Sequence, residues 1–193
     1  AMRQTQPGWN ECEVDALIDF TFRRRGGTGA AYNNIVAGGD NACILHYVEN
    51  DQPLKDGDLL LIDAGCESNY YAADVTRTFP VNGSFSPEQR AVYEAVLASQ
   101  VSTIEGLAPG VAFDWMHQRA LEGIVDGLLE LGLLKGTRES VIADRSYERF
   151  YMHKAGHWLG LDVHDCGAYF IDGESRLLEE GMVLTVEPGI YIA

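Results

Sequence analysis

Three stretches of the chain repeat apolar residues at the three- and four-residue spacing that is typical of amphipathic helices. The predicted helices span residues 10–25, 86–106 and 114–131. Asn10 and Glu13 have the spacing of a capping box, and Ser86-Pro87 places a cap before a proline at the first helical position. We expect the second helix to bury its regularly spaced apolar side chains, which are Val92, Val96, Leu97, Val101 and Ile104.

Short runs rich in β-branched and aromatic residues alternate with turn-forming residues, which indicates strands. The predicted strands span residues 34–37, 42–48, 59–64, 70–73, 75–81, 150–152 and 182–186. The run 59–64 is apolar on both faces, which predicts a central position in a sheet. The chain has no internal repeat and no clear linker, so we expect one α+β domain over residues 1–193.

Composition narrows the class of protein. The 193 residues are 46% hydrophobic and carry a formal charge of −15, which disfavours binding to nucleic acid or to an anionic membrane surface. No apolar run approaches the roughly 20 residues of a membrane span, and no secretion signal is evident. The 4 cysteines lack metal-site spacing, which is typical of reduced thiols. We therefore expect a cytoplasmic protein.

Two aspartates follow or interrupt apolar segments. Asp63 ends the run 59–63, and Asp74 lies among small and apolar neighbours. An ionised carboxylate in such a place is costly without a cation, and two of them face to face require a metal or a shared proton. The alternative is structural: Asp63 would cap a turn at Gly65, and Asp74 would pair with Arg77.

Three of the 5 histidines cluster within residues 153–164. The spacing of His153 and His157 invites comparison with the zinc helix HExxH, but Lys154 occupies the position of the general-base glutamate, and the nearby glycines disfavour a helix. The alternative is that these histidines are buried and satisfied by backbone carbonyls. His164 completes the cluster.

Glu187 repeats the pattern of Asp63, because it ends an apolar run just before a Pro-Gly turn. Asp63, Asp74, His157 and Glu187 together offer oxygen and imidazole ligands, which suit Mn, Co, Zn or Fe better than a thiolate-bound metal. Two such ions that share a carboxylate and activate a bridging water are a standard arrangement for hydrolysis.

Five blocks of the sequence carry a resemblance to a known family. They are Ile44–Tyr47, Leu61–Cys66, Ala73–Pro80, His157–Asp165 and Val186–Gly189. In order and spacing they resemble the catalytic domain of Xaa-Pro aminopeptidase (aminopeptidase P), a metallopeptidase with the pita-bread fold that prolidase, methionine aminopeptidase and creatinase share. The resemblance implies an α+β fold in which helices cover a curved antiparallel sheet.

The resemblance also implies roles for individual residues. Asp63 would chelate one metal, Asp74 would bridge both, and His157 and Glu187 would hold the other. His46, His153 and His164 match histidines that line the site, bind substrate, shuttle protons and stabilise the tetrahedral intermediate. The implied cofactors are two divalent ions, with Mn²⁺ the usual metal, and the implied reaction is hydrolysis of the bond between an N-terminal residue and a following proline.

Some features depart from the family pattern. A fifth ligand, a glutamate bridging both metals, is expected on a strand beyond Ala193, so we expect the 193-residue chain to bind metal weakly and to turn over slowly or not at all. We also expect the family's N-terminal domain to lie outside these 193 residues. Lys154 stands where relatives usually have glycine. We expect the full-length protein to form a homo-oligomer.

Other functions remain open on the sequence alone. Prolidase is the nearest enzyme alternative and would cleave only Xaa-Pro dipeptides. The other class is a binding module, since some pita-bread domains in histone chaperones bind peptides or histones without catalysis, and an acidic chain suits a basic partner. Those domains usually lose the ligands, whereas four are present here.

Overall fold

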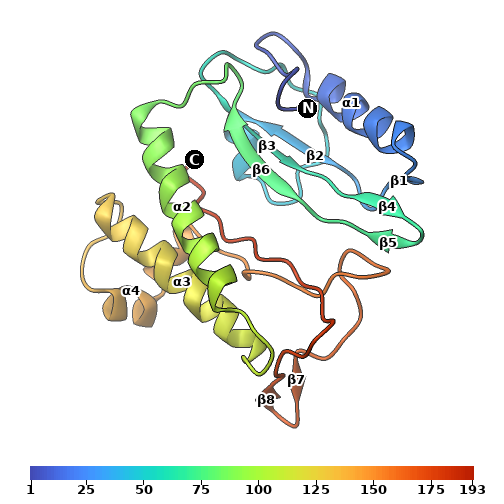
Figure 1. The fold of residues 1–193 in the computed structure, drawn as a ribbon. Helices are drawn as coiled ribbons and strands as arrows, with labels where there is room; N and C mark the ends of the chain where they lie inside the picture. Colours follow the sequence, from blue (N-terminus) through green and yellow to red (C-terminus); the bar gives the residue numbers. More distant parts are fainter. The chain divides into compact units, whose positions relative to one another are not determined.

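The computed structural model describes all 193 residues, and they form two compact units (Figure 1). Unit 1 comprises residues 1–86, 159–165 and 193, and unit 2 comprises residues 87–158 and 166–192. Unit 1 contains α1 (Glu11–Arg24), β1 (Gly29–Ala30), β2 (Ile35–Gly38), the 3-10 helix Gly39–Cys43, β3 (Leu59–Asp63), β4 (Cys66–Ser68), β5 (Tyr71–Ala72) and β6 (Thr76–Pro80). Unit 2 contains α2 (Pro87–Gly106), α3 (Phe113–Glu130), α4 (Arg138–Asp144), the 3-10 helix Ser146–Arg149, β7 (Phe170–Ile171) and β8 (Glu174–Ser175).

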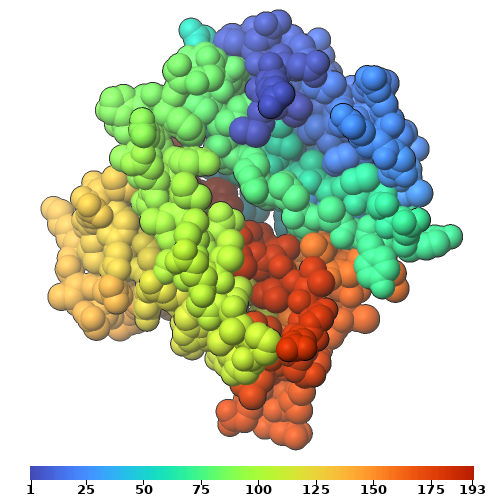
Figure 2. Space-filling view, in the orientation of Figure 1, coloured from blue at the N-terminus to red at the C-terminus, as the bar shows by residue number.

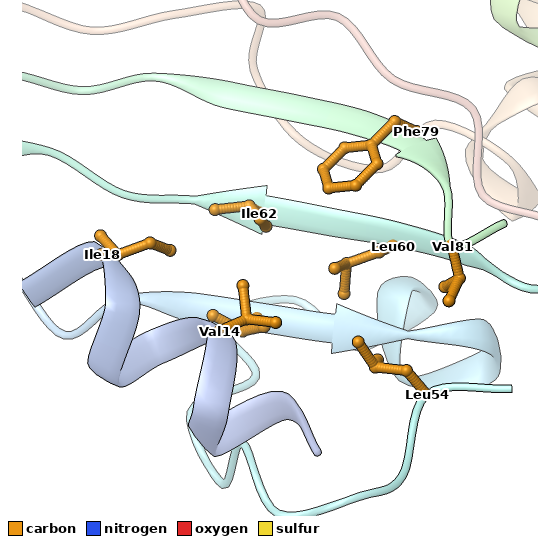
Figure 3. Packing of buried hydrophobic residues seen from close by; sticks show 8 residues of the cluster. Val14, Ile18, Leu54, Leu60, Ile62, Phe79 and Val81 are labelled. Atoms are coloured by element: carbon orange, nitrogen blue, oxygen red, sulfur yellow. The ribbon is translucent and has the colours of Figure 1, made fainter. Parts of the chain in front are cut away.

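Unit 1 is built on two small antiparallel sheets, with strand orders β2-β3-β6 and β1-β4-β5. The predicted central strand is confirmed, because β3 pairs with β2 on one side and with β6 on the other. Helix α1, closed by the predicted capping box at Asn10, turns Val14 and Ile18 towards the sheet, where they pack with Leu60 and Ile62 (Figure 3). This apolar core holds the strand that ends at Asp63.

The strand predicted over residues 42–48 is wrong. The chain forms a 3-10 helix there, followed by a turn closed by a hydrogen bond from the Tyr47 amide to the Ile44 carbonyl oxygen. His46 has φ 56° in this turn, a left-handed conformation that cannot continue a strand. The Tyr47 hydroxyl, and Asn41 just before this segment, donate hydrogen bonds to Glu11 on α1, so tertiary contacts replace strand pairing.

Unit 2 is organised around the α2–α3 pair, and both helices match their predicted ranges closely. Small residues set the contact: a Cβ built at Gly123 would lie 2.9 Å from Ser99 Cβ, and one at Gly127 would lie 2.8 Å from Ala95 Cβ. The predicted buried face of α2 is therefore wrong in part, because Leu97, Val101 and Ile104 are exposed. The space-filling view shows one face of α2, in light green, at the surface (Figure 2).

The strands predicted over residues 150–152 and 182–186 are also wrong as regular elements. Segment 182–187 makes one isolated bridge, between Trp158 and Leu184. A Cβ at Gly156 would lie 2.1 Å from the Thr185 carbonyl oxygen, so the two segments approach too closely and unevenly for a regular ladder. The short hairpin β7–β8 was not anticipated by the apolar pattern.

The mixed helix and strand content confirms the predicted α+β class, although the antiparallel pairing is divided among three small sheets. No helix in the chain combines the length and the apolar character that crossing a bilayer requires.

Candidate metal centre

Asp63 and Asp74 are positioned by the same part of unit 1. Asp63 is the last residue of β3, and Asp74 lies two residues before β6, the strand that pairs with β3. Between them the chain passes very close to itself: a Cβ at Gly65 would lie 1.6 Å from the Ala73 carbonyl oxygen. Glycine is therefore required at position 65, and this close approach brings the segments that carry the two aspartates together.

The Tyr32 hydroxyl links the two carboxylates. It hydrogen bonds to Asp63 Oδ1 and lies 3.0 Å from Asp74 Oδ1. Burial, and then the two neighbouring carboxylates, raise the pKa of Tyr32 above its ordinary value, so the hydroxyl keeps its proton at neutral pH. One hydroxyl proton serves two carboxylate oxygens, which fits a site where a cation supplies the remaining positive charge.

Unit 2 supplies a second cluster, made of His157, Glu187 and Thr185. His157 Nε2 lies 3.2 Å from Glu187 Oε1. The Thr185 hydroxyl accepts a hydrogen bond from the His157 amide over 3.0 Å and donates one to Glu187 Oε1 over 2.7 Å. A single threonine therefore orients both predicted ligands of this unit.

The proton arrangement on His157 suits a metal ligand. Its Nδ1 lies 2.9 Å from the Trp158 carbonyl oxygen, and because a carbonyl oxygen only accepts, Nδ1 carries the proton. In the neutral ring Nε2 then presents a lone pair towards Glu187 Oε1, and two facing acceptors require either a second proton or a cation between them. Metal-bound histidines commonly have this backbone-anchored tautomer. The donor set of each unit thus fits a divalent ion.

The three predicted catalytic histidines lie in different settings. His46 is exposed in unit 1, at the left-handed position of its turn. His164 is exposed in the segment 159–165, which belongs to the same unit. His153 is half-buried in unit 2, where its Nδ1 faces the Lys154 carbonyl oxygen at 2.8 Å and its Nε2 lies 3.0 Å from the Tyr191 hydroxyl.

The sequence also allowed purely structural roles for Asp74, His153 and His157, and the structure agrees with these alternatives only in part. The Arg77 guanidinium donates to the Thr76 carbonyl oxygen, whereas the Asp74 carboxylate faces Tyr32. No helix spans His153 and His157, in agreement with the rejection of the HExxH pattern. Both rings do bond backbone carbonyls, but neither is fully buried, and the Lys154 side chain is exposed.

Sequence reasoning did not identify Tyr32, Thr185 or Tyr191, although each contacts a predicted site residue. Thr185 lies inside the apolar run before Glu187, and its hydroxyl was the available signal for a ligand-orienting role. No local pattern indicates the partners of Tyr32 and Tyr191, because those partners, Asp63 and His153, lie 31 and 38 residues away along the chain.

Comparison with known proteins identifies the class of protein that carries these ligands. Metallopeptidase family M24 matches residues 1–193, and the chain belongs to that family. The predicted resemblance is thereby confirmed, as is the metallopeptidase class that it implied.

The relatives narrow the likeness to one kind of M24 protein. The chain is 54% identical to the Xaa-Pro aminopeptidase of Haemophilus influenzae over 193 residues and 49% identical to that of Escherichia coli, covering all of this chain in both cases. The chain spans 45% and 44% of the length of these two relatives.

Solved structures agree with the sequence relatives. The aminopeptidase PepP of Pseudomonas aeruginosa matches with a TM-score of 0.98 and 54% identity, over 100% of this chain and 43% of that one. A zinc-substituted Escherichia coli aminopeptidase P in complex with product matches with a TM-score of 0.95 and 48% identity, over 100% of this chain and 43% of that one. These likenesses confirm the predicted pita-bread fold class.

Proposed function

We propose that this chain is part of the catalytic domain of an Xaa-Pro aminopeptidase, which hydrolyses the bond between an N-terminal residue and a following proline. The observation that carries the proposal is the pair of preorganised ligand clusters: Asp63 and Asp74 at Tyr32, and His157 and Glu187 at Thr185. Relatives of this sequence named as Xaa-Pro aminopeptidases support the substrate class. Both units would belong to the one catalytic domain.

In this proposal Asp63, Asp74, His157 and Glu187 hold two divalent metal ions, with Mn²⁺ the first candidate and Co, Zn or Fe alternatives. When bound, the metals supply a water activated for attack on the scissile carbonyl carbon. Asp74 would be shared by the two ions, while Asp63 would hold one and His157 with Glu187 would hold the other. The zinc-substituted relative supports a site that accepts more than one metal.

The protein's own side chains have separate tasks. Tyr32 holds the carboxylates of Asp63 and Asp74 in place through its retained proton, and Thr185 fixes Glu187. His46, His153 and His164 bind the peptide and move protons between substrate and solvent. In the tautomer whose Nδ1 proton is donated to the Lys154 carbonyl oxygen, His153 accepts a hydrogen bond from the Tyr191 hydroxyl at Nε2.

The proposal extends to the setting of the protein. The substrate is a peptide with proline at position two, and neither nucleic acid nor a membrane is a partner. We propose a cytoplasmic location and a homo-oligomeric full-length protein. Prolidase is the competing activity, and cleavage restricted to dipeptides would identify it. Tight binding of basic peptides without cleavage would instead favour the non-catalytic module.

The test combines metal analysis with a peptide assay. The purified full-length protein would be stripped of metal, reloaded with Mn²⁺ and analysed by inductively coupled plasma mass spectrometry. It would then be offered a tripeptide and a dipeptide with proline at position two, and matched peptides with alanine there. Release of the first residue from the proline tripeptide alone supports the proposal. A metal-loaded protein that releases no residue from any of these peptides contradicts it.

A further inference from the structure

Glu11 is the most completely buried acidic residue of the chain, and the proposed chemistry does not use it. Its side chain is 0% exposed at the first position of α1. It takes hydrogen bonds from four groups of the segment 38–52, which runs from the last residue of β2 into the connection to β3. The donors are the Gly38 amide at 2.8 Å, Asn41 Nδ2 at 3.0 Å, the Tyr47 hydroxyl at 2.7 Å and the Gln52 amide at 3.0 Å.

All four donors are neutral, so the carboxylate is solvated by the protein and not neutralised by a cation. Such a site is stable only while every donor stays in place, because a buried carboxylate that loses its partners is costly. The Tyr47 hydroxyl takes part as a donor: burial, and then Glu11, raise the pKa of Tyr47 to about 12. Glu11 therefore draws four separated points of one segment to α1.

This segment includes His46, one of the residues assigned to the proposed site. His46 occupies the third position of the turn from Ile44 to Tyr47, with φ 56°. Glycine or asparagine usually supplies a positive φ at that position, and another residue holds it only where the surrounding structure imposes it. The next residue, Tyr47, makes the contact that imposes this conformation on His46. Its ring is 5% exposed, and its hydroxyl donates a hydrogen bond to Glu11.

A second tether fixes the other side of the turn. Asn50 is 6% exposed, and its side chain accepts from the Val36 amide at 3.0 Å and donates to the Asn34 carbonyl oxygen at 2.9 Å. Tyr47 and Asn50 therefore hold the turn from two directions. The His46 ring is exposed, as are the Ile44 and Leu45 side chains of the same turn.

We infer that Glu11 is a positioning residue for the proposed peptidase reaction, because it holds the Tyr47 side of the turn and thereby keeps His46 in the left-handed conformation that presents its ring to the substrate. The inference rests on the proposed function for the role of His46. Its structural part, the dependence of the His46 backbone on Glu11, does not.

The first test is nuclear magnetic resonance on the 193-residue chain and its Glu11→Gln variant. Each carboxylate oxygen of Glu11 accepts hydrogen bonds from two donors. In Glu11→Gln the side-chain NH₂ group replaces one of these oxygens, so in either orientation of the amide it faces two donors and cannot accept from them. We expect the His46 Cα and Cβ shifts to leave the left-handed range. Amide exchange at Gly38 and Gln52 should become about 10-fold faster. Glu49→Gln, an equal change on an exposed side chain of the same segment, should alter neither.

Unchanged His46 shifts in a folded Glu11→Gln protein overturn the inference, even where exchange at Gly38 and Gln52 accelerates. If Glu11→Gln does not fold, Tyr47→Phe serves instead, since it removes a single hydroxyl and leaves three of the four donors. Because these measurements need no catalysis, they stand whether or not the peptidase activity is found.

The second test asks whether the effect reaches the reaction through His46. In the Xaa-Pro peptide assay Tyr47→Phe should lower kcat/KM by about 10-fold in the native background and by less than about 2-fold when His46 is already alanine. Equal losses in both backgrounds would assign Tyr47 and Glu11 a purely structural role. Absence of peptide cleavage by the native protein would count against the proposed function alone.

Discussion

The two ligand clusters rest on different kinds of scaffold. In unit 1, Asp63 ends a hydrogen-bonded strand whose neighbours Leu60 and Ile62 are buried in the core under α1. In unit 2, His157 and Glu187 lie on irregular segments that make one isolated bridge and a few backbone bonds. A regular sheet positions the first cluster, whereas the Thr185 hydroxyl positions the second, so substitutions should affect the two clusters differently.

The largest effect is expected at the carboxylate cluster. Asp74→Asn removes the proposed bridge between the metals, and we expect peptidase activity to fall by more than about 100-fold, beyond what changes outside the direct ligands usually cost. The unfolding temperature should change little, because the sheet is intact. Asp40→Asn, which removes an exposed charge from unit 1, is the control, and equal losses in both variants would contradict the assignment.

The next effect should separate the two scaffolds. Thr185→Val keeps the shape of the side chain but removes the hydroxyl that joins His157 to Glu187, and we expect metal affinity to fall by about 10-fold. Thr185→Ser keeps the hydroxyl and should bind metal almost normally. Calorimetric titration with Mn²⁺ measures both. Equal affinities for the valine and serine variants would show that the backbone alone orients this cluster.

A smaller effect concerns acid stability in unit 2. Burial, with Lys154 and His153 nearby, lowers the pKa of His117 to about 4. The unfolded chain, with an ordinary histidine pKa of about 6.5, then binds more protons between these values. The contribution of neutral His117 to the free energy of unfolding is therefore complete above about pH 6.5 and is lost as pH falls towards 4.

Because His117 is partly exposed, we expect the free energy of unfolding to fall by only about 1 kcal/mol from this source between pH 7 and pH 5. The His117→Leu variant lacks the group and should not show this part of the loss. Urea unfolding at a series of pH values measures it. The same pair of proteins compared above pH 7, where the contribution is complete, controls for altered packing. Parallel stability curves for the two proteins would contradict the prediction.

The smallest effect is expected on the regular helix of unit 2. Leu97→Ala on α2 should change the free energy of unfolding by less than about 0.5 kcal/mol, because Leu97 is 42% exposed and α2 meets α3 through small residues. Leu128→Ala on α3 should cost about 2 to 5 kcal/mol, because Leu128 is 0% exposed. Similar losses at both positions would indicate that α2 buries its apolar stripe in solution.

The same contrast explains what the sequence could predict. The capped helices and the central strand were predictable because caps, proline position and a continuous apolar run act locally. The face of α2 was not, since the apolar spacing cannot show that Ser99 meets Gly123 on another helix. The segment 42–48 failed for a related reason, because its partner Glu11 lies more than 30 residues earlier in the chain.

The candidate site divides in a similar way. Asp63, Asp74, His157 and Glu187 were identifiable because charged or imidazole groups beside apolar runs are unusual, and the resemblance ordered them. Their orienting partners Tyr32 and Thr185 are common residue types whose roles depend on contacts formed only after folding.

Unit 1 is not continuous along the chain, and this affects the order in which the protein can assemble. The segment 159–165, which carries His164, belongs to unit 1, and its Gly160 carbonyl oxygen accepts from the Ala72 amide over 2.8 Å. A ribosome adding about 5 to 20 residues per second needs roughly 4 to 15 seconds for the intervening chain. The sheet β1-β4-β5 must therefore wait for this hydrogen bond from Ala72 of β5, while α2 and α3, adjacent in sequence, already have each other as partners. During synthesis the helix pair can be complete before unit 1 is, although every strand of the sheet that carries Asp63 is made before α2.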